Sequence, residues 1–488
     1  MRFLIASWIM ATLVGSAVAQ PLTVPLAKLN PGDVARIPEP FLHKPSKLPD
    51  RVILTWSGDP ATTQAVTWRT DTTVETPVAQ LAKSEVGPKL KPLGSTVSVV
   101  TTPLKSNINE AFYHSVNFTD LTPSTKYVYR LGDGSNWTEW YQFETASDKP
   151  DPLRFIYFGD AQNDLKMHWS RVVRGAYSDM PKAHFILHAG DLVNQGSKDA
   201  EWGEWHTAAG WINGMVPCVP TPGNHEYSGK KGLTEHWRPQ FALPENGPKG
   251  LEESAFFFDI QGVRIVSLNS NEKQKDQVEW LDNVLANNPN KWTVLTFHHP
   301  IYSAAKGRDN KTVRDLWRPV IEKYGVDIVL TGHDHTYARS GLMRDDNLLE
   351  TSRVTEQGTV YVVSVSGPKM YTVEEESWMK SSAQDTQLYQ LITIDGDKLH
   401  YEARTARGDL YDEFELRKSE GAGNQIVERD QLDSERSVQE SPSRKQLILA
   451  VAAMLGIAVF FGAVKAGRWL GRKRAAKTPA SETKPPQA

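Results

Sequence analysis

Carboxylate, amide and imidazole side chains follow directly after five short apolar runs in the middle of the chain. The runs and the side chains after them are 155–158 with Asp160, 185–187 with Asp191, 219–222 with Asn224 and His225, 294–297 with His298 and His299, and 328–331 with His333, Asp334 and His335. A single aspartate after a turn glycine is common, because Asp favours turns. In open α/β sheets, however, metals and ligands bind just outside the carboxyl ends of the strands. Five such endings together therefore predict a metal centre formed by loops that follow the strands.

The types of these side chains indicate which ions the centre would hold. Hard and borderline divalent ions take carboxylate oxygens, amide oxygens and imidazole nitrogens. A centre of two ions about 3.5–4 Å apart needs one carboxylate that bridges them. Asp191 is the expected bridge, because it is a single carboxylate at a strand end with other strand ends beside it. His333 and His335 can each face a different ion, whereas His184 and His400 are assigned to ordinary polar positions.

The elements that must position these side chains begin near residue 152. Apolar runs alternate there with stretches in which apolar residues recur at the i, i+3 and i+4 spacing of an amphipathic helix. Examples of such stretches are 169–177, 202–212 and 313–324, and their aromatic residues are interpreted as core faces. The alternation over 152–416 predicts an α/β domain with mixed sheets packed between helices, an αββα sandwich.

The segment 35–147 has no long helical period. Short strands with alternating apolar residues are predicted near 52–56, 65–68, 114–118, 126–131 and 140–143. Evenly spaced strands separated by turn sequences are typical of a small antiparallel β-sandwich. No titratable cluster lies at the ends of these strands, so the sandwich is expected to have a structural or positioning role. The sequence does not indicate a protein partner for it.

The two ends of the chain carry targeting patterns. Arg2, an apolar run and Ala17-Val18-Ala19 predict a signal peptide over 1–19. The Glu-, Arg-, Ser-, Gln- and Asp-rich segment 417–445 is predicted to be a disordered stalk. Residues 447–464 carry no charge and would extend about 27 Å as a helix, which predicts one transmembrane helix followed by a basic cytoplasmic tail over 465–488. The predicted location is therefore the membrane, with the α/β domain outside the cytoplasm.

Net charge and cysteine content argue against a nucleic-acid-binding protein and against a disulfide-stabilised fold. The 488 residues carry a net charge of −3, and the isoelectric point is near 6.5. Nucleic acid is therefore not expected as the main partner, because such binding needs a basic surface. Cys218 is the only cysteine of the sequence, so an intramolecular disulfide is excluded.

Five sequence motifs resemble those of the calcineurin-like metallophosphoesterases. They are G-D-A-Q, G-D-L-V-N, G-N-H-E, L-T-F-H-H and G-H-D-H, in this order along the chain. Within that superfamily the chain is most similar to purple acid phosphatases, which implies that the N-terminal β-sandwich is fibronectin III-like. By this resemblance, Asp160, Asp191 and His335 hold the first ion, Asp191, Asn224, His298 and His333 hold the second, and His225 and His299 contact the phosphate and protonate the leaving oxygen. Glu226 is expected either to orient His225 or to lie at the surface.

Two positions depart from the purple acid phosphatase pattern. That family has a tyrosine three residues after the bridging aspartate, where this chain has Asn194. A colourless enzyme with Mn²⁺, Fe²⁺ or Zn²⁺ is therefore expected instead of one with a purple Fe(III) centre. Many relatives place a histidine two residues after the first aspartate, where this chain has Gln162. Gln162 resembles the glutamine ligand of manganese-dependent ADP-ribose/CDP-alcohol diphosphatases, and it is expected either to bind the first ion or to hydrogen-bond a water on that ion.

These features predict a phosphoester hydrolase that resembles acid phosphatases and acts on a phosphorylated small molecule. Two ions neutralise the phosphoryl oxygens and lower the pKa of a bound water, which provides the hydroxide nucleophile. A phosphodiesterase or nucleotide diphosphatase remains an alternative, because the same scaffold serves several reactions. A surface binding protein on a degenerate enzyme scaffold is the second alternative.

Overall fold

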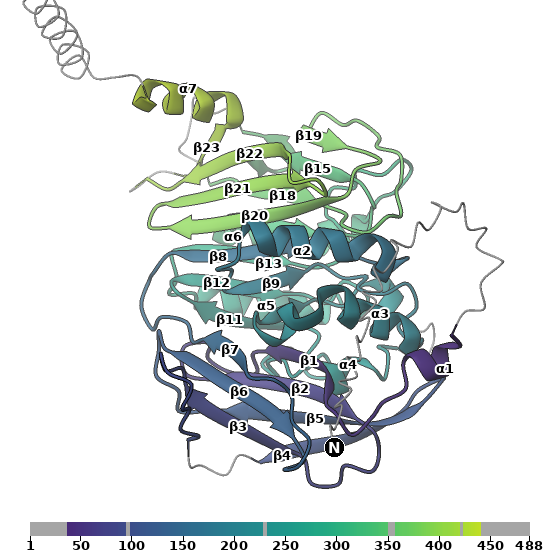
Figure 1. Cartoon of the computed structure of the whole chain (residues 1–488). Helices are drawn as coiled ribbons and strands as arrows, with labels where there is room; N and C mark the ends of the chain where they lie inside the picture. The colour runs from purple at the N-terminus through teal and green to yellow at the C-terminus, as the bar shows by residue number, and fades with distance from the viewer. Residues whose placement is uncertain (1–36, 94–97, 228–231, 350–356, 420–422, 441–488) are drawn as a thin grey trace, which may run out of the picture.

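The computed structural model describes residues 37–93, 98–227, 232–349, 357–419 and 423–440. The N-terminal part of this chain is a pair of β-sheets, and the C-terminal part contains two larger sheets with helices on their outer faces (Figure 1). The predicted order, a β-sandwich followed by an α/β domain of mixed sheets, is confirmed.

The N-terminal part consists of two antiparallel sheets, with strand orders β1-β2-β5-β4 and β3-β6-β7. The strands are β1 (Asp50–Thr55), β2 (Gln64–Thr70), β3 (Val78–Lys83), β4 (Val99–Lys105), β5 (Glu110–Phe118), β6 (Lys126–Gly132) and β7 (Tyr141–Glu144), preceded by the short helix α1 (Glu39–Leu42). Trp68, Phe118 and Tyr129 are buried between the two sheets. Successive residues of a strand point to opposite faces, so residues of alternate positions form this core.

Two seven-stranded sheets form the centre of the C-terminal part. Their strand orders are β10-β9-β8-β20-β21-β22-β23 and β11-β12-β13-β14-β18-β15-β19. The first contains β8 (Leu153–Phe158), β9 (Phe185–His188), β10 (Cys218–Pro220), β20 (Leu388–Asp395), β21 (Lys398–Thr405), β22 (Leu410–Arg417) and β23 (Gln425–Glu428). The second contains β11 (Phe256–Ile260), β12 (Val263–Ser267), β13 (Trp292–Thr296), β14 (Ile328–Thr331), β15 (Tyr337–Ser340), β18 (Val360–Val363) and β19 (Met379–Ala383), and β16 (Met343–Arg344) and β17 (Asn347–Leu348) form a separate hairpin. Strands β8, β9 and β10 are parallel, as are β12, β13, β14 and β18.

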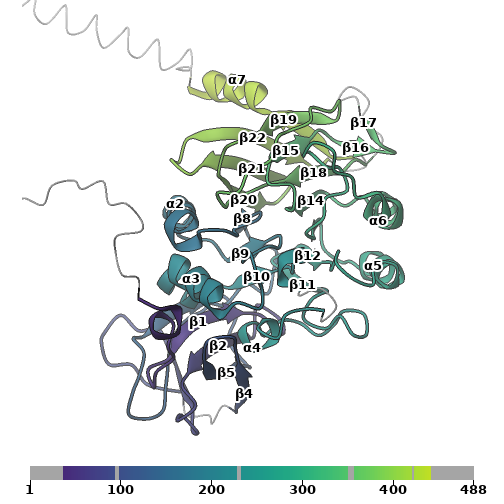
Figure 2. The same cartoon turned by 90° about the vertical axis from the view of Figure 1, so that its right-hand side faces the viewer.

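Helices cover the outer face of each large sheet (Figure 2). On the first sheet lie the π-helical turn η1 (Leu165–Trp169), α2 (Ser170–Asp179) and α3 (Asp199–Ala209), and on the second lie α5 (Asp276–Ala286) and α6 (Lys311–Tyr324). The further short helices are η2 (Gly210–Gly214), η3 (Asn224–Glu226) and α4 (Trp237–Gln240). Neighbouring residues of β13 show the layers, because Val294 lies in the core between the sheets and Leu295 lies in the core beneath α5 and α6.

A buried ion pair fixes the β-sandwich to the α/β domain. Arg51 of β1 donates to both carboxylate oxygens of Asp199 at the start of α3, over 2.6 and 2.9 Å. Arg69 of β2 lies 3.4 Å from the same carboxylate. At the other end of β1, Trp56 packs against the α/β domain, with its ring centroid 5.5 Å from that of Phe258. Because charges and large apolar side chains are both buried here, the contact is a stable part of the fold.

The segment predicted as a disordered stalk is partly ordered. Residues 425–428 form β23 at the edge of the first sheet, and α7 (Arg429–Glu440) follows it. Leu432 of α7 is buried, and Arg436 contacts the buried carboxylate of Glu413 on β22. Composition predicted disorder because the segment is strongly polar, but its charges pair with carboxylates on a neighbouring strand.

The predicted membrane span requires a correction. In the part of the chain that the structure describes, no helix combines the length and the apolar character needed to cross a bilayer. This finding contradicts the transmembrane part of the predicted fold class and the membrane location derived from it. An uncharged run of this length meets the hydropathy requirement for a span, but hydropathy alone does not establish one. The run 447–464, the tail 465–488 and the predicted signal peptide 1–19 themselves lie outside the described residues.

We expect Arg51→Met to lower the free energy of unfolding by about 3 kcal/mol, because it leaves the buried Asp199 carboxylate without its main partner. Denaturant unfolding of the full chain measures this change. Lys105→Met is the matched control, since Lys105 forms an exposed pair with Glu110 and should leave the stability unchanged. Equal stability of the two variants would show that the interface ion pair does not stabilise the protein.

Candidate metal centre

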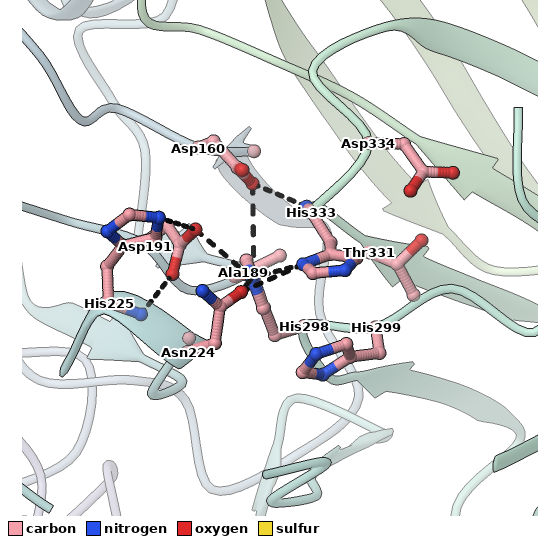
Figure 3. A network of polar contacts seen from close by, with 12 residues as sticks. Asp160, Ala189, Asp191, Asn224, His225, His298, His299, Thr331, His333 and Asp334 are labelled. Atoms are coloured by element: carbon pink, nitrogen blue, oxygen red, sulfur yellow. Dashed lines mark hydrogen bonds and ion pairs between the residues drawn. The ribbon is translucent and has the colours of Figure 1, made fainter. Parts of the chain in front are cut away.

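The loops after β8, β9, β10, β13 and β14 meet at one edge of the two sheets (Figure 3). They bring together all the side chains that the sequence analysis proposed as metal ligands. These are Asp160, Gln162, Asp191, Asn224, His298, His333 and His335. The parallel register explains the convergence, because the last residues of β8, β9 and β10 pair as Phe158 with His188 and His188 with Pro220.

The first group of possible ligand atoms surrounds the buried carboxylate of Asp160. His335 Nε2 lies 3.1 Å from Asp160 Oδ2. The amide nitrogen of Gln162 lies 3.0 Å from His335 Nε2 and 2.9 Å from Asp191 Oδ2. Asp160, Asp191 and His335 are close enough together to hold one ion.

The second group of possible ligand atoms shares Asp191 with the first. His298 Nε2 is 3.2 Å from Asp191 Oδ2 and 3.1 Å from His333 Nδ1. The amide oxygen of Asn224 lies 3.0 Å from His298 Nε2 and 2.9 Å from His333 Nδ1. The same carboxylate oxygen of Asp191 therefore touches both groups, as the carboxylate bridge of a dinuclear centre must.

The donor set fits a pair of metal ions. With metal–ligand bonds of about 2.0–2.2 Å, neighbouring ligand atoms lie roughly 3 Å apart, which is the spacing found here. Asp160 Oδ2 and Gln162 Oε1 are buried and have no hydrogen-bond partner among the described residues. Buried polar atoms without a partner are costly, so both are available to a cation.

Of the three histidines proposed as ligands, His298 and His335 are oriented by backbone carbonyl groups. His298 Nδ1 lies 2.9 Å from the carbonyl oxygen of Ala189, and His335 Nδ1 lies 2.9 Å from that of Lys369. Each Nδ1–H can donate to its carbonyl oxygen, which leaves the lone pair of Nε2 directed at the centre. This arrangement is typical of histidines that bind metals.

The charges of the centre favour a cation between the two aspartates. Burial raises the pKa of Asp160 to about 7, although the nearby His298 opposes this effect. Burial would also raise the pKa of Asp191, but His298 and His225 outweigh it and lower that pKa to about 2. Burial opposes a charge on His298, yet Asp191 and Asp160 raise its pKa to about 9. The two carboxylates thus favour positive charge in the pocket, which a second proton on His298 supplies or which a bound cation would supply in its place.

Glu226 is a positioning residue whose role differs from both roles that the sequence analysis expected for it. Its side chain is fully buried and accepts N–H bonds from Gly223, Asp191 and Leu192 at 2.7, 2.9 and 2.9 Å. Asp191 has a φ of 50°, in the left-handed region that costs energy in residues other than glycine. Glu226 therefore holds the backbone of Asp191 in a strained turn, and it neither orients His225 nor lies at the surface. The only sequence signal was its place in G-N-H-E beside Asn224.

A glycine explains why the two turns can approach so closely. A Cβ at Gly223 would lie 2.1 Å from Asp191 Oδ1 and 2.2 Å from the Asp191 backbone nitrogen. Any larger residue would therefore push the loop that carries Asn224 away from Asp191.

His225 and His299 lie at the rim of the centre. His225 Nδ1 is 2.5 Å from the carbonyl oxygen of Asn194, and His225 Nε2 is 3.8 Å from Asp191 Oδ2. His299 Nδ1 lies 2.8 Å from Ser270 Oγ, and its ring centroid is 4.1 Å from that of His333. A cavity of about 610 Å³ opens beside His299 and reaches Asn224, so a small molecule can approach the centre from this side.

Comparison with protein families gives two matches along the chain. Residues 49–145 match the purple acid phosphatase N-terminal domain, and residues 153–337 match the calcineurin-like phosphoesterases. Purple acid phosphatase 15 of Arabidopsis thaliana is 27% identical over 299 residues, which are 54% of this chain and 54% of that protein. Acid phosphatase type 7 of Homo sapiens is 24% identical over 359 residues, which are 67% of this chain and 79% of that protein.

Other relatives and solved structures agree in fold. An uncharacterised protein of Mycobacterium tuberculosis is 26% identical over 336 residues, or 60% of this chain and 62% of that protein. The chain thus matches between about half and four fifths of the length of these relatives. The purple acid phosphatase of yellow lupin (Lupinus luteus) seeds superposes with a TM-score of 0.65 and 19% identity, over 77% of this chain and 75% of that one. PhoD superposes with a TM-score of 0.56 and 14% identity, over 83% of this chain and 99% of that one.

We expect Glu226→Ala to weaken metal binding by about 10- to 100-fold, because the N–H groups that fix the turn at Asp191 lose their acceptor. Isothermal titration of the metal-free protein with Mn²⁺ or Zn²⁺ measures the affinity, and circular dichroism checks the fold. Glu235→Ala serves as the control, since Glu235 is exposed and lies outside the centre. Unchanged metal affinity in a folded Glu226→Ala protein would contradict the positioning role.

Proposed function

Because this chain is a calcineurin-like metallophosphoesterase that carries the N-terminal domain of purple acid phosphatases, we propose that it hydrolyses phosphate monoesters at a centre of two metal ions. The observation that carries the proposal is the position of Asp191 Oδ2. It lies 2.9 Å from Gln162 in the first ligand group and 3.2 Å from His298 in the second. A carboxylate in this position can bridge two ions and hold them at the distance that phosphoryl transfer needs.

Seven side chains are assigned to the two ions. Asp160, Gln162, Asp191 and His335 would hold the first ion, and Asp191, Asn224, His298 and His333 would hold the second. Gln162 needs one further argument, because its nitrogen faces His335 and its oxygen has no partner among the described residues. The two ends of a carboxamide are distinguished only by their hydrogen bonds, so rotation by 180° would direct Oε1 at the first ion. This orientation would also give the buried oxygen a partner.

The identity of the ions follows from the ligand types. Asn194 stands where purple acid phosphatases have their tyrosine ligand. Its backbone carbonyl oxygen forms a hydrogen bond with His225 Nδ1. With only carboxylate, amide and imidazole ligands, we expect Mn²⁺, Fe²⁺ or Zn²⁺ and a colourless protein.

The residues around the ions supply the remaining chemistry. Bound ions would neutralise phosphoryl oxygens and activate a water molecule. The hydrogen bond of His225 Nδ1 to the Asn194 carbonyl fixes the ring, so that Nε2 is free to hold a proton near the leaving oxygen. His299, held by Ser270, lies against His333 and is available to contact the phosphate.

Metal content and substrate preference test the proposal together. The purified protein should bind two ions, lose its activity after chelation and regain it with Mn²⁺ or Zn²⁺. Among p-nitrophenyl phosphate, bis-p-nitrophenyl phosphate, ADP-ribose and a mononucleotide, the monoesters should have the highest kcat/KM. Preference for the diester or for ADP-ribose would favour the phosphodiesterase or diphosphatase alternative.

Gln162→Ala should weaken binding of one ion by about 10-fold or more, whereas unchanged binding of both would exclude Gln162 as a ligand.

We expect His225→Ala to lower kcat by about 10²- to 10⁴-fold without loss of metal, because a general acid is removed while the ligands remain. Steady-state kinetics and metal analysis of the same preparation measure the two quantities. His168→Ala, on η1 outside the centre, is the control variant and should retain the activity. Loss of an ion from His225→Ala would show that His225 is a ligand and not the acid.

A further inference from the structure

His333 differs from the other two histidines of the centre in the partner of its outer nitrogen. His298 and His335 each turn that nitrogen toward a backbone carbonyl oxygen. The outer nitrogen of His333, Nε2, instead contacts a guanidinium nitrogen of Arg308. A guanidinium group can only donate, so this contact requires a lone pair on Nε2.

The contact between Arg308 and His333 therefore does not suit a loaded centre. When Nδ1 of a neutral imidazole binds an ion, the ring carries its hydrogen on Nε2. An Nε2–H cannot accept from Arg308. Ion binding at His333 would thus release the guanidinium group from the ring and leave its donors available to another acceptor.

Two neighbours keep Arg308 at the rim after such a release. Its Nε lies 3.2 Å from the buried carboxylate of Asp334, and its guanidinium carbon lies 5.2 Å from the ring centroid of Tyr371. The amino group of Lys369 lies 5.5 Å from the centroid of the same ring. We call Arg308, Lys369 and Tyr371 the cationic rim.

The backbone ties the cationic rim to the centre. Tyr371 N–H donates to the carbonyl oxygen of His335 over 3.0 Å, and the Lys369 carbonyl orients the His335 ring. The two loops that carry the rim are joined, because Lys306 N–H donates to Thr372 over 3.0 Å. The rim is therefore built on the same loops as the proposed ligands.

The charge of the rim is only partly neutralised by the carboxylates that the structure describes, because Arg308 is paired with Asp334 and Lys369 has no such partner. Asp334 is the carboxylate beside Arg308, and it also accepts the N–H of Ala304 over 2.8 Å. No described carboxylate forms an ion pair with Lys369. The cavity on the His299 side differs, because its charged residues Asp309 and Lys311 are paired with Arg314 and Asp315.

We propose that the cationic rim binds a second acidic group of the substrate, a phosphate or a carboxylate, at a distance from the phosphate that reacts. This inference rests on the proposed function. The guanidinium group lies on the far side of the His333 ring from Asn224 and His298, so the ring separates it from a phosphoryl group held between the ions. The substrate class is therefore an organic phosphate that carries a further anionic group.

Two phosphonates that differ in one carboxylate test the rim without turnover. Isothermal titration of the metal-loaded protein with 3-phosphonopropionate and propylphosphonate should show about tenfold tighter binding of the first. Arg308→Met and Lys369→Met should each remove most of this preference. Lys182→Met removes an exposed charge away from the centre and should keep it. Hydrolysis of 3-phosphoglycerate and glycerol 3-phosphate should follow the same pattern in kcat/KM.

Three results of the binding experiment would contradict a second anion site at the cationic rim. Equal affinity of the wild-type protein for both phosphonates would do so, as would an unchanged preference in both methionine variants. Loss of affinity for both phosphonates by the same factor would show that Arg308 holds the reacting phosphate instead. In each case, hydrolysis of glycerol 3-phosphate by the wild-type protein would leave the proposed function standing. Absence of hydrolysis of any phosphate ester would reject the proposed function and the rim with it.

Discussion

The structure depends on one buried carboxylate, that of Asp191, which needs positive charge on both of its sides. Asp160 lies in the same pocket, and Glu226 lies directly behind it with its own carboxylate buried. The carboxyl group of Glu226 accepts backbone N–H groups, whereas Asp191 Oδ2 faces the side chains of Gln162, His298 and His225. Burying carboxylates in this way is unfavourable unless a cation compensates them. The fold therefore creates a site whose stability and chemistry are both linked to metal binding.

The β-sandwich supports the loops of the candidate metal centre from outside the α/β domain. Arg51 holds Asp199, which begins the helix eight residues after Asp191. Between them, the N–H of Gly196 donates to the carbonyl oxygen of His225 over 2.8 Å and joins the loops that follow β9 and β10. On the other side, Thr67 of the sandwich donates to the carbonyl oxygen of Gln240 over 2.5 Å. The sandwich thus supports the loops of the centre, which gives it a role that needs no separate partner.

The parts of the protein that the sequence predicted are those determined by local pattern. Apolar runs such as 155–158 and 294–297 are strands because both faces are buried, and their ends are marked by glycine or histidine. The ligands could be proposed from these ends, since parallel strands bring their carboxyl ends to one edge. Local pattern failed where long-range pairing decides the structure. Polar composition hid the ordered segment 425–440, in which 425–428 pair with β22 and Arg436 contacts Glu413.

Glu226 and Arg308 show why the rest of the centre could not be predicted. Glu226 was visible as a motif residue, but its role consists of hydrogen bonds to backbone groups 33 to 35 residues earlier. Arg308 lies late in the loop between β13 and α6, and its contact with His333 bridges 25 residues between two loops. Neither the hydrogen bonds of Glu226 nor the contact of Arg308 can be predicted from sequence spacing, because both depend on how the turns at Asp191 and His333 bend. Both turns have positive φ values, 50° and 73°, which sequence alone does not reveal in residues other than glycine. Strand ends therefore predict which side chains gather at the candidate centre, whereas the residues that position and flank these side chains depend on the conformation of the turns.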